Sequence, residues 1–315
     1  MLTKEQNLRI TTFITDYAKA KFEFHCMYLM NSVLNKWTKE VLLKDKYPLV
    51  VNNPNKPLII FIDDRPTEIL RFTIINSLIM CRLKMKGVLY TLQSKVSALK
   101  DFLYDLKDWV DVVPINDNDI KTFAGKNYSH LLKRKSFWEQ IPSNKVLIVQ
   151  TDALLIEPID FSIFNYDYVG APFTPGKFSS IPIYTYSSDL MRECGVTWIT
   201  LKFQMHDILL SGKVLFGNGG LSVRNTSQMI NMCNIEPKIN NEPEPEDIYF
   251  GRLLSSNKGK LPSLRDARRF ACESEYFDSI GSHASHLYLK DEEQAKIYAR
   301  HISHLNGIIT ASYEQ

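Results

Sequence analysis

Several acidic residues stand where a carboxylate could bind a metal ion or accept a proton. Asp152 follows the apolar run 146–149 after Gln150 and Thr151, so we expect it at the carboxyl end of a buried strand. A carboxylate in that position can hold Mg²⁺ or Mn²⁺, and the ion can neutralise a diphosphate. The alternative interpretation is an aspartate that only opens a turn.

The pair Glu246 and Asp247 follows Pro243 and Pro245 and opens a predicted short helix over residues 247–254. A hydroxyl group is a poor nucleophile at neutral pH, and a carboxylate held beside it can take its proton during attack. Either carboxylate could therefore act as a general base. Acidic residues at a helix start also serve simply as caps, which is the competing interpretation.

Basic side chains that could neutralise diphosphate oxygens occur in separate parts of the chain. Arg65 follows the first predicted strand, and Lys135 ends the basic run 133–135 before the strand that leads to Asp152. Arginine would bind such oxygens in a bidentate manner and lysine as a point charge. A basic run more commonly belongs to a solvated helix face. His283 could be a neutral imidazole ligand of the same metal ion, although a surface histidine is the simpler interpretation.

A glycine cluster at residues 217–220 could let the backbone approach a ligand closely, because three of its four positions lack a side chain. The remaining residue, Asn218, could form hydrogen bonds with the hydroxyl groups of a sugar. A tight turn with positive φ, in which the amide bonds its own backbone, is the alternative. Tyr184, Tyr186 and Trp198 could form an apolar wall for a sugar ring or pack in the core.

The elements that must position these residues follow from the apolar pattern. Short apolar runs predict strands at 58–62, 88–92, 110–115 and 146–149, and helical periodicity predicts helices at 69–82, 96–106 and 127–140. This alternation indicates an α/β fold with a mostly parallel sheet flanked by helices. Polar residues then lie just past the strand ends, where open sheets of this kind bind ligands. A strand at 166–170 and a closing helix at 295–305 complete the prediction.

A helical segment precedes this α/β part. Helical spacing of i, i+3, i+4 and i+7 is found at Ile10, Phe13, Ile14 and Tyr17. This spacing predicts a helix from about 4 to 21, and a second helix is expected to extend to about 43. Prolines in the stretch 47–57 close the helical extension.

Composition places the chain among ordinary globular proteins. Its 315 residues are 44% hydrophobic and 23% charged, which excludes disordered, collagen-like and coiled-coil classes. The net charge of +3 is too small to require a nucleic-acid partner. The five cysteines are never spaced as Cys-x-x-Cys, which indicates buried free thiols in a reducing compartment.

Neither a membrane span nor a signal peptide is evident in the sequence. No apolar run reaches the roughly 20 residues that a span needs, and no apolar leader region follows Met1. We therefore expect a soluble, cytoplasmic protein. Glycine-rich phosphate loops, the dinucleotide fingerprint, the Gly-x-Ser-x-Gly elbow and His-Glu-x-x-His are also missing, which disfavours kinases, dinucleotide oxidoreductases, esterases and zinc peptidases.

Taken in order, these segments resemble the DUF5672 family of predicted glycosyltransferases over roughly residues 56–290. The resemblance rests on the segments 64–66, 127–138, 146–152, 166–172, 217–222, 246–250 and 261–264. The joint order of Gln-Thr-Asp, Gly-Asn-Gly-Gly-Leu-Ser and Glu-Asp-x-Tyr-Phe is specific. The resemblance implies a GT-A-like fold, with a nucleotide-binding half at about 56–155 and an acceptor half at about 156–290. Residues 1–50 and 291–315 would be an N-terminal helical extension and a C-terminal helix and tail.

The resemblance also implies roles for the residues introduced above. Asp152 would hold Mn²⁺ or Mg²⁺ together with His283, at the position of a D-x-D motif in which Gln150 replaces the first carboxylate. Asp247 would be the catalytic base, with Glu246 as the second candidate. Donor binding would involve Asp64, Arg65, Lys135, Gln150, Thr151, Asp152, Asn218, Gly219 and Gly220.

These roles predict a metal-assisted, inverting glycosyltransferase that moves a sugar from a nucleoside-diphosphate sugar to a hydroxyl of a glycan, protein or lipid. Two alternatives stay open. A nucleotidyltransferase would handle the same ligands, but residues 63–66 stand where its glycine-rich basic loop would be. A non-catalytic nucleotide-sugar-binding or scaffold protein is favoured by Gln150, which stands in place of a carboxylate.

Overall fold

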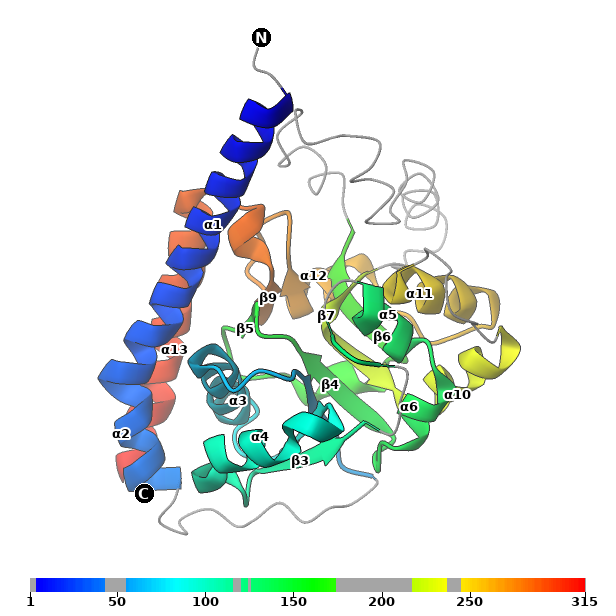
Figure 1. Ribbon diagram of the computed structural model, residues 1–315, viewed down its shortest axis with the longest axis horizontal. Coiled ribbons are helices and arrows are strands. Elements are labelled where there is room, and N and C mark those ends of the chain that lie inside the picture. The colour runs from blue at the N-terminus through cyan, green and yellow to red at the C-terminus, as the bar shows by residue number, and fades with distance from the viewer. Residues whose placement is uncertain are drawn as a thin grey trace.

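The computed structural model describes residues 4–42, 55–115, 120–123, 126–173, 217–236 and 245–314. A six-stranded sheet forms its centre, with the strands in the order β3–β2–β1–β4–β7–β6 (Figure 1). The strands are β1 (Leu58–Ile62), β2 (Lys86–Thr91), β3 (Val110–Pro114), β4 (Lys145–Val149), β6 (Tyr168–Pro172) and β7 (Gly217–Asn225). Strands β3, β2, β1 and β4 are parallel, and β7 runs antiparallel to both of its neighbours. The predicted α/β class with a mostly parallel sheet is confirmed.

The sheet separates two hydrophobic cores, because alternate residues of its central strands point to opposite faces. In β1, Ile59 and Phe61 belong to one core, whereas Leu58, Ile60 and Ile62 belong to the other. Every residue of β1 is buried. A continuous apolar run is what a strand covered on both faces requires, which explains why the sequence reveals this strand.

Helices cover both faces of the sheet (Figure 1). The first core receives side chains from α1 (Lys4–Leu29), α3 (Glu68–Met80), α4 (Val96–Phe102), α12 (Leu264–Phe270) and α13 (Asp291–Glu314). The second core receives side chains from α5 (Lys126–Leu132), α6 (Lys135–Glu139), α10 (Thr226–Ile235) and α11 (Glu246–Ser256).

Two predicted helices are shorter than the sequence indicates. The helix expected at 127–140 is divided into α5 and α6 at Arg134, whose backbone is extended with φ −93° and ψ 127°. The helix expected at 96–106 ends at Phe102, and a 3₁₀ turn follows at Tyr104–Leu106. In both cases the helical spacing of apolar residues continues past the point where the helix is interrupted, so the sequence pattern does not show the interruption.

The N-terminal helix is longer than the sequence predicts. After α1 the chain continues through a π-helical stretch (Met30–Leu34), α2 (Asn35–Trp37) and a second π-helical stretch (Thr38–Leu42), so the break expected near residue 21 is wrong. The apolar positions that predicted this helix face solvent, with exposed fractions of 45% to 71% for Ile10, Phe13, Ile14 and Tyr17. Phe22, Cys26 and Leu29 of the same helix are buried instead.

Helix α13 lies beside α1 (Figure 1), and polar contacts join both helices to α3. Nε2 of His25 lies 3.0 Å from Nδ1 of His301, and Nε2 of His301 lies 2.8 Å from Oδ1 of Asn76. Farther along, Nε1 of Trp37 donates to Oγ of Ser312 at 2.8 Å. The two ends of the chain therefore form one helical layer over α3.

A smaller sheet brings distant residues next to the end of β4. It contains β5 (Ala153–Leu155), β9 (Gly281–His283) and β8 (Ala271–Cys272), in the order β5–β9–β8. In the antiparallel pair of β5 and β9, Ala153 stands opposite His283, and the N–H of Ala284 donates to the carbonyl oxygen of Asp152 at 3.0 Å. Residues 152 and 283 are neighbours for this reason.

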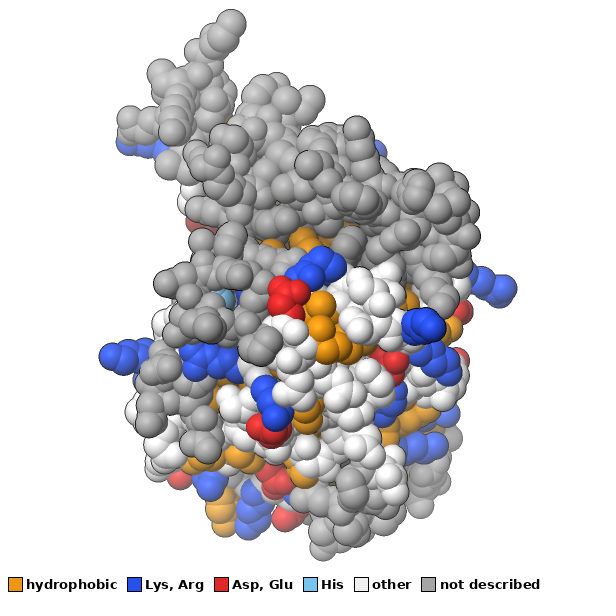
Figure 2. All heavy atoms as spheres, turned by 90° about the vertical axis from the view of Figure 1, so that its right-hand side faces the viewer, with side chains coloured by type: hydrophobic (Ala, Val, Ile, Leu, Met, Phe, Trp, Pro, Cys, Tyr) orange, Lys and Arg blue, Asp and Glu red, His pale blue; other side chains and the backbone are white. Residues whose placement is uncertain are grey.

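Several sequence-based expectations concern thiols and the surface. Cys26, Cys81, Cys233 and Cys272 are buried free thiols, as predicted for them, and Cys194 lies outside the described residues. Figure 2 views the face over α6, α10 and α11, where basic, acidic, apolar and uncharged side chains of the described residues are intermixed. Within the described ranges, no helix has the length and apolar character that crossing a bilayer demands.

Candidate functional site

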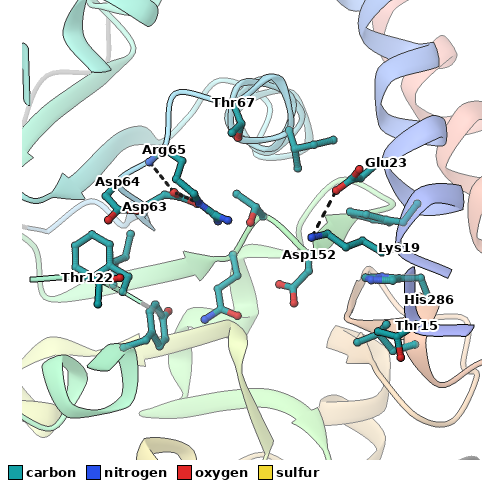
Figure 3. Close-up of a pocket in the computed structure, with 18 residues that line it drawn as sticks. Thr15, Lys19, Glu23, Asp63, Asp64, Arg65, Thr67, Thr122, Asp152 and His286 are labelled. Carbon is teal, nitrogen blue, oxygen red and sulfur yellow. Dashed lines mark hydrogen bonds and ion pairs between the residues drawn. The ribbon is translucent and has the colours of Figure 1, made fainter. Parts of the chain in front are cut away.

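A cavity of about 650 Å³ opens where β1 and β4 end (Figure 3). β2 lies on one side of β1 and β4 on the other, so the direction of strand order reverses between β1 and β4. Ligands of open α/β sheets bind outside the carboxyl ends of the strands at such a reversal. The walls come from the segments that follow β1 and β4, from α1, from the start of α3, and from the 3₁₀ turn Ser285–Leu287 after β9. Thr122, Phe123 and Tyr128, before and within α5, complete the lining.

The segment after β1 is fixed by Asp63. Its buried carboxylate accepts hydrogen bonds from the backbone N–H of Arg65 at 2.9 Å, from Nε at 3.0 Å and from Nη2 at 2.8 Å. The hydrogen bond to Asp63 raises the pKa of the Arg65 guanidinium above its ordinary value. Asp63, Asp64 and Arg65 all line the cavity, and Asp63, which no sequence pattern singled out, anchors the guanidinium.

Asp152, Gln150 and His283 converge at the end of β4. Nε2 of His283 lies 3.2 Å from Oδ1 of Asp152 and 3.0 Å from Oε1 of Gln150. On the other side of the ring, Nδ1 lies 3.5 Å from Oε1 of Glu273. The side chain of Asp152 is 43% exposed, whereas those of His283 and Glu273 are buried. The Asp152 carboxylate therefore faces the cavity, with the other side chains behind it.

The ring of His283 is a cation between these carboxylates. Burial alone would lower its pKa, but the charge of Asp152 and the interactions with Asp152 and Glu273 raise the pKa to about 10. Burial alone would raise the pKa of Asp152, but the charge and hydrogen bond of His283 hold it at about 2. At neutral pH the pair is therefore a carboxylate facing an imidazolium.

The same atoms fit a divalent cation, which would displace the proton on Nε2 of His283 when it binds. Two ligand atoms 3.2 Å apart can both reach one ion at about 2.1 Å, and Oε1 of Gln150 is a third atom of suitable type at the same point. A carboxylate behind the second nitrogen of a metal-bound histidine orients the ring, and Glu273 occupies that place. Among the residues described, no three His, Cys, Asp or Glu side chains are grouped as a metal-binding cluster, so the Gln150 amide is needed to complete the set.

Strand β7 provides the space for these side chains. The turn considered at residues 217–220 is wrong, because the segment begins β7, and none of its glycines has a φ in the left-handed region. A Cβ atom on Gly220 would lie 2.1 Å from Nε2 of His283 and 2.4 Å from Oε1 of Gln150. A Cβ atom on Gly219 would lie 2.0 Å from Oε1 of Glu246. These glycines therefore make room for neighbouring side chains.

Glu246 has a structural partner that the sequence did not reveal. Its carboxylate lies 2.8 Å from Nη1 of Arg224, and both side chains are buried. The Arg224 guanidinium also lies over the rings of Trp138, Tyr168 and Phe250, at 4.9 to 5.7 Å from their centroids. This buried ion pair anchors the start of α11. Because the carboxylate is already engaged by a guanidinium, we do not retain Glu246 as a candidate base.

Asp247 and Lys135 are not among the residues that line the cavity. Asp247 is half-buried in the first turn of α11, where its Oδ1 accepts the N–H of Ile248 at 2.8 Å. Lys135 begins α6 and pairs with Glu139 at 3.1 Å on the helix surface. Lys135 thus lies on a solvated helix face, which was the alternative interpretation of the basic run.

Asn218 orients a neighbour of His283. Its Nδ2 donates to Oε1 of Glu273 at 2.8 Å, and its Oδ1 accepts the N–H of Gly220 at 2.7 Å. The amide is therefore engaged with the groups behind the cavity wall. Tyr184, Tyr186 and Trp198, considered as a sugar-stacking wall, lie outside the described residues.

Helix α1 forms a wall of the cavity that the sequence analysis did not anticipate. Thr15, Lys19, Phe22 and Glu23 line the cavity, and Figure 3 shows Lys19 and Glu23 on the side where Asp152 lies. The ring of Phe22 stacks on His286, with centroids 4.7 Å apart. The spacing of residues 15, 19, 22 and 23 places them on one face of α1, but the sequence does not say which face of the helix meets the sheet.

Fold and cavity together define an α/β protein with a cavity at the reversal point of its sheet. The family described as "Protein of unknown function (DUF5672)" matches residues 110–287, more than half of the chain, and the chain belongs to this family. The match is narrower than the expected range 56–290, since it leaves β1, the segment 63–66, α3 and β2 outside, and α1 lies outside both ranges. No curated protein matches the chain.

Among solved structures, the chain is similar to the mannosyltransferase PcManGT from Pyrobaculum calidifontis in complex with GDP-Man and Mn²⁺. The two share 12% sequence identity with a TM-score of 0.37, and the similarity covers 80% of this chain. The chain spans 65% of the length of that enzyme. A similarity this low does not bear on function.

Proposed function

We propose that this chain is a glycosyltransferase that uses a nucleoside-diphosphate sugar and a divalent cation, Mn²⁺ or Mg²⁺. The observation that carries the proposal is the convergence of Asp152, Gln150 and His283 in a cavity at the reversal point of the sheet. Ligand cavities commonly measure about 300–1,000 Å³. The volume of about 650 Å³ falls in this range and suits a nucleotide sugar.

The charges on the cavity walls support a cation-dependent anionic ligand. Carboxylates from Glu23, Asp63, Asp64 and Asp152 line the cavity, against the cations Lys19 and Arg65. Among the described lining residues the negative charges thus exceed the positive ones by two. A diphosphate would be repelled by this excess unless a divalent cation accompanied it.

The two strand ends suggest how the donor lies. Asp64 and Arg65 would contact the nucleotide after β1, and Gln150, Thr151 and Asp152 would surround the diphosphate after β4. When bound to Asp152, Gln150 and His283, the cation would neutralise the diphosphate as it leaves. Glu273 would hold the His283 ring in place from behind.

Transfer needs a base for the acceptor hydroxyl, and Asp247 stays our prediction for that base. Helix α11 begins against Gly219, next to the glycine on which His283 and Gln150 pack. In the reaction the base takes the hydroxyl proton while the oxygen attacks the anomeric carbon. The bond from that carbon to the diphosphate oxygen breaks, and in-line attack inverts the configuration.

A non-catalytic nucleotide-sugar-binding protein is the second candidate. It is favoured by one observation, that Asp247 does not line the cavity that contains Asp152. The two candidates differ in the fate of the donor. A transferase hydrolyses its donor slowly without acceptor, whereas a binding protein leaves the donor intact.

Thermal unfolding of the full chain with UDP-, GDP-, dTDP- and CMP-sugars plus Mn²⁺ tests the proposal. A ligand at 100 times its Kd stabilises the folded state by about 2.7 kcal/mol. We expect one nucleotide class to raise the Tm of the wild type but not of Asp152→Asn. Asp101→Asn, on the exposed surface of α4, is the matched control and should respond like the wild type. Equal stabilisation of Asp152→Asn and the wild type would refute the assigned site.

A further inference from the structure

We propose that Lys19 of α1 binds phosphate oxygens of the donor diphosphate, so that a helix outside the family-matched region is part of the binding site. This inference rests on the proposed function, because it assigns a partner to the anionic part of that ligand. It also gives the N-terminal extension a role that its sequence does not suggest.

Lys19 and Asp152 share one side of the cavity. Both residues line it, and Figure 3 shows Lys19 extending from α1 toward the side where Asp152 lies. His286 lines the same side of the cavity, and the ring of Phe22, one turn after Lys19 on α1, stacks on it. A diphosphate bound at Asp152 would therefore lie near the Lys19 ammonium group.

The positive charge of Lys19 is the more available of the two cations among the described lining residues. Arg65 is fixed by hydrogen bonds of 2.8 and 3.0 Å from its guanidinium to Asp63. Lys19 makes a 3.9 Å ion pair with Glu23, and its own side chain is 61% exposed. An exposed pair at that distance is weak, so phosphate oxygens can replace Glu23 as the partner of Lys19.

Contacts of the residues that follow Lys19 hold α1 against the cavity. Phe22 stacks on His286 in the cavity wall, and Lys21 pairs with Asp291 at the start of α13. His25, about one helical turn after Phe22, is hydrogen-bonded to His301 of α13. The backbone at residue 19 is thus fixed relative to Asp152, while the long side chain remains free to reach the ligand.

Calorimetric titration of inorganic pyrophosphate at a fixed excess of Mg²⁺ into the full chain tests this inference. We expect Lys19→Gln to weaken binding about five- to tenfold, because it removes a charge-assisted contact, and Lys19→Arg to retain most of the affinity. Glu23→Gln should strengthen binding about twofold, because it removes the competing anion. Lys36→Gln, an exposed lysine of α2, controls for the change in net charge and should bind like the wild type.

The outcomes separate this inference from the proposed function. Equal binding by Lys19→Gln and Lys36→Gln, together with lost binding by Asp152→Asn, would overturn the role of Lys19 and leave the proposed function standing. Absence of pyrophosphate binding by the wild type would overturn both. Because Lys19 is a surface residue, the thermal unfolding curve of Lys19→Gln should match that of the wild type, so weaker binding reports the lost contact.

Discussion

At the scale of single residues, the imidazole of His283 joins the parts of the candidate site. Nε2 faces Asp152 and Gln150, and Nδ1 faces Glu273. The ring fits closely on the backbone of Gly220, where a side chain has no room. A single methyl group at this glycine therefore tests whether the arrangement matters for binding.

Gly220→Ala should disrupt donor binding. The added Cβ atom would lie 2.1 Å from Nε2 of His283, a distance at which the ring must move away from Asp152. We expect at least a tenfold loss of Mn²⁺-dependent affinity for the stabilising nucleotide sugar, measured by calorimetry. Gly307→Ala in α13, where a Cβ atom meets nothing within 4 Å, should bind normally and unfold at the same or a slightly higher temperature. Unchanged affinity in Gly220→Ala would show that His283 does not contribute.

Asp247→Asn should separate catalysis from binding. Removing a general base typically lowers the rate about 10²- to 10⁴-fold, whereas donor binding at Asp152 should be unaffected. Transfer rates and donor affinity of the variant, measured side by side, check this. Near-normal turnover would remove Asp247 from the mechanism, and a product with retained anomeric configuration would do the same.

At the scale of elements, the buried pair of Arg224 and Glu246 connects β7 with the start of α11. Glu246→Gln leaves the guanidinium without its counter-charge in a buried site, which costs about 3–5 kcal/mol of unfolding free energy. The exposed pair of Glu236 and Arg252 has a similar distance of 2.9 Å, so Glu236→Gln is a matched control with an expected cost of about 0–1 kcal/mol. Urea unfolding measures both, and equal losses would contradict the structural role of Glu246.

A chain of neutral histidines joins the helical layer to α3. Nδ2 of Asn76 donates to the carbonyl oxygen of Leu155 at 3.0 Å, so Oδ1 is left to accept from Nε2 of His301. Nδ1 of His301 then accepts from Nε2 of His25. Burial lowers the pKa of His25 to about 4 and that of His301 well below its ordinary value, and charge repulsion by His25 and then by His304 adds to the effect on His301.

This chain predicts acid sensitivity. Because the folded-state pKa values lie below the unfolded value of about 6.5, the unfolded state binds more protons as the pH falls. The stability is complete well above pH 6.5 and is lost as the pH falls toward 4, by about 2 kcal/mol for His25 by pH 5, and the lowered pKa of His301 adds to the loss. Urea unfolding at pH 7 and pH 5 should show the loss, and a smaller loss in His25→Gln. Equal pH dependence in that variant would contradict the assignment to His25.

Helices and strands could be predicted from the sequence where a local pattern of apolar residues determines them. Continuous apolar runs located β1 and β4 because both strands are covered on both faces. The N-terminal helix was recognised from Ile10 and Phe13, yet these side chains are exposed, because tertiary packing decides which face of a helix is buried. Contacts between residues far apart in the sequence leave no local pattern, among them those of Arg224, Glu273 and Phe22.

At the scale of the whole molecule, the cavity combines parts of the chain that lie far apart in sequence. The family-matched region 110–287 contributes β4, β7 and β9 with Asp152 and His283. The segments before it contribute Arg65 after β1 and Lys19 on α1. The terminal helices α1 and α13 lie side by side at one edge of the molecule (Figure 1), so the two chain ends together support one wall of the cavity.

Anomalous diffraction tests the central claim most directly, using crystals of the full chain grown with Mn²⁺ and the nucleotide sugar that gives the largest stabilisation. We predict an anomalous peak at about 2.0–2.3 Å from both Oδ1 of Asp152 and Nε2 of His283, with the diphosphate beside it. A nucleotide bound outside this cavity, or Mn²⁺ bound away from Asp152, would contradict the proposed site.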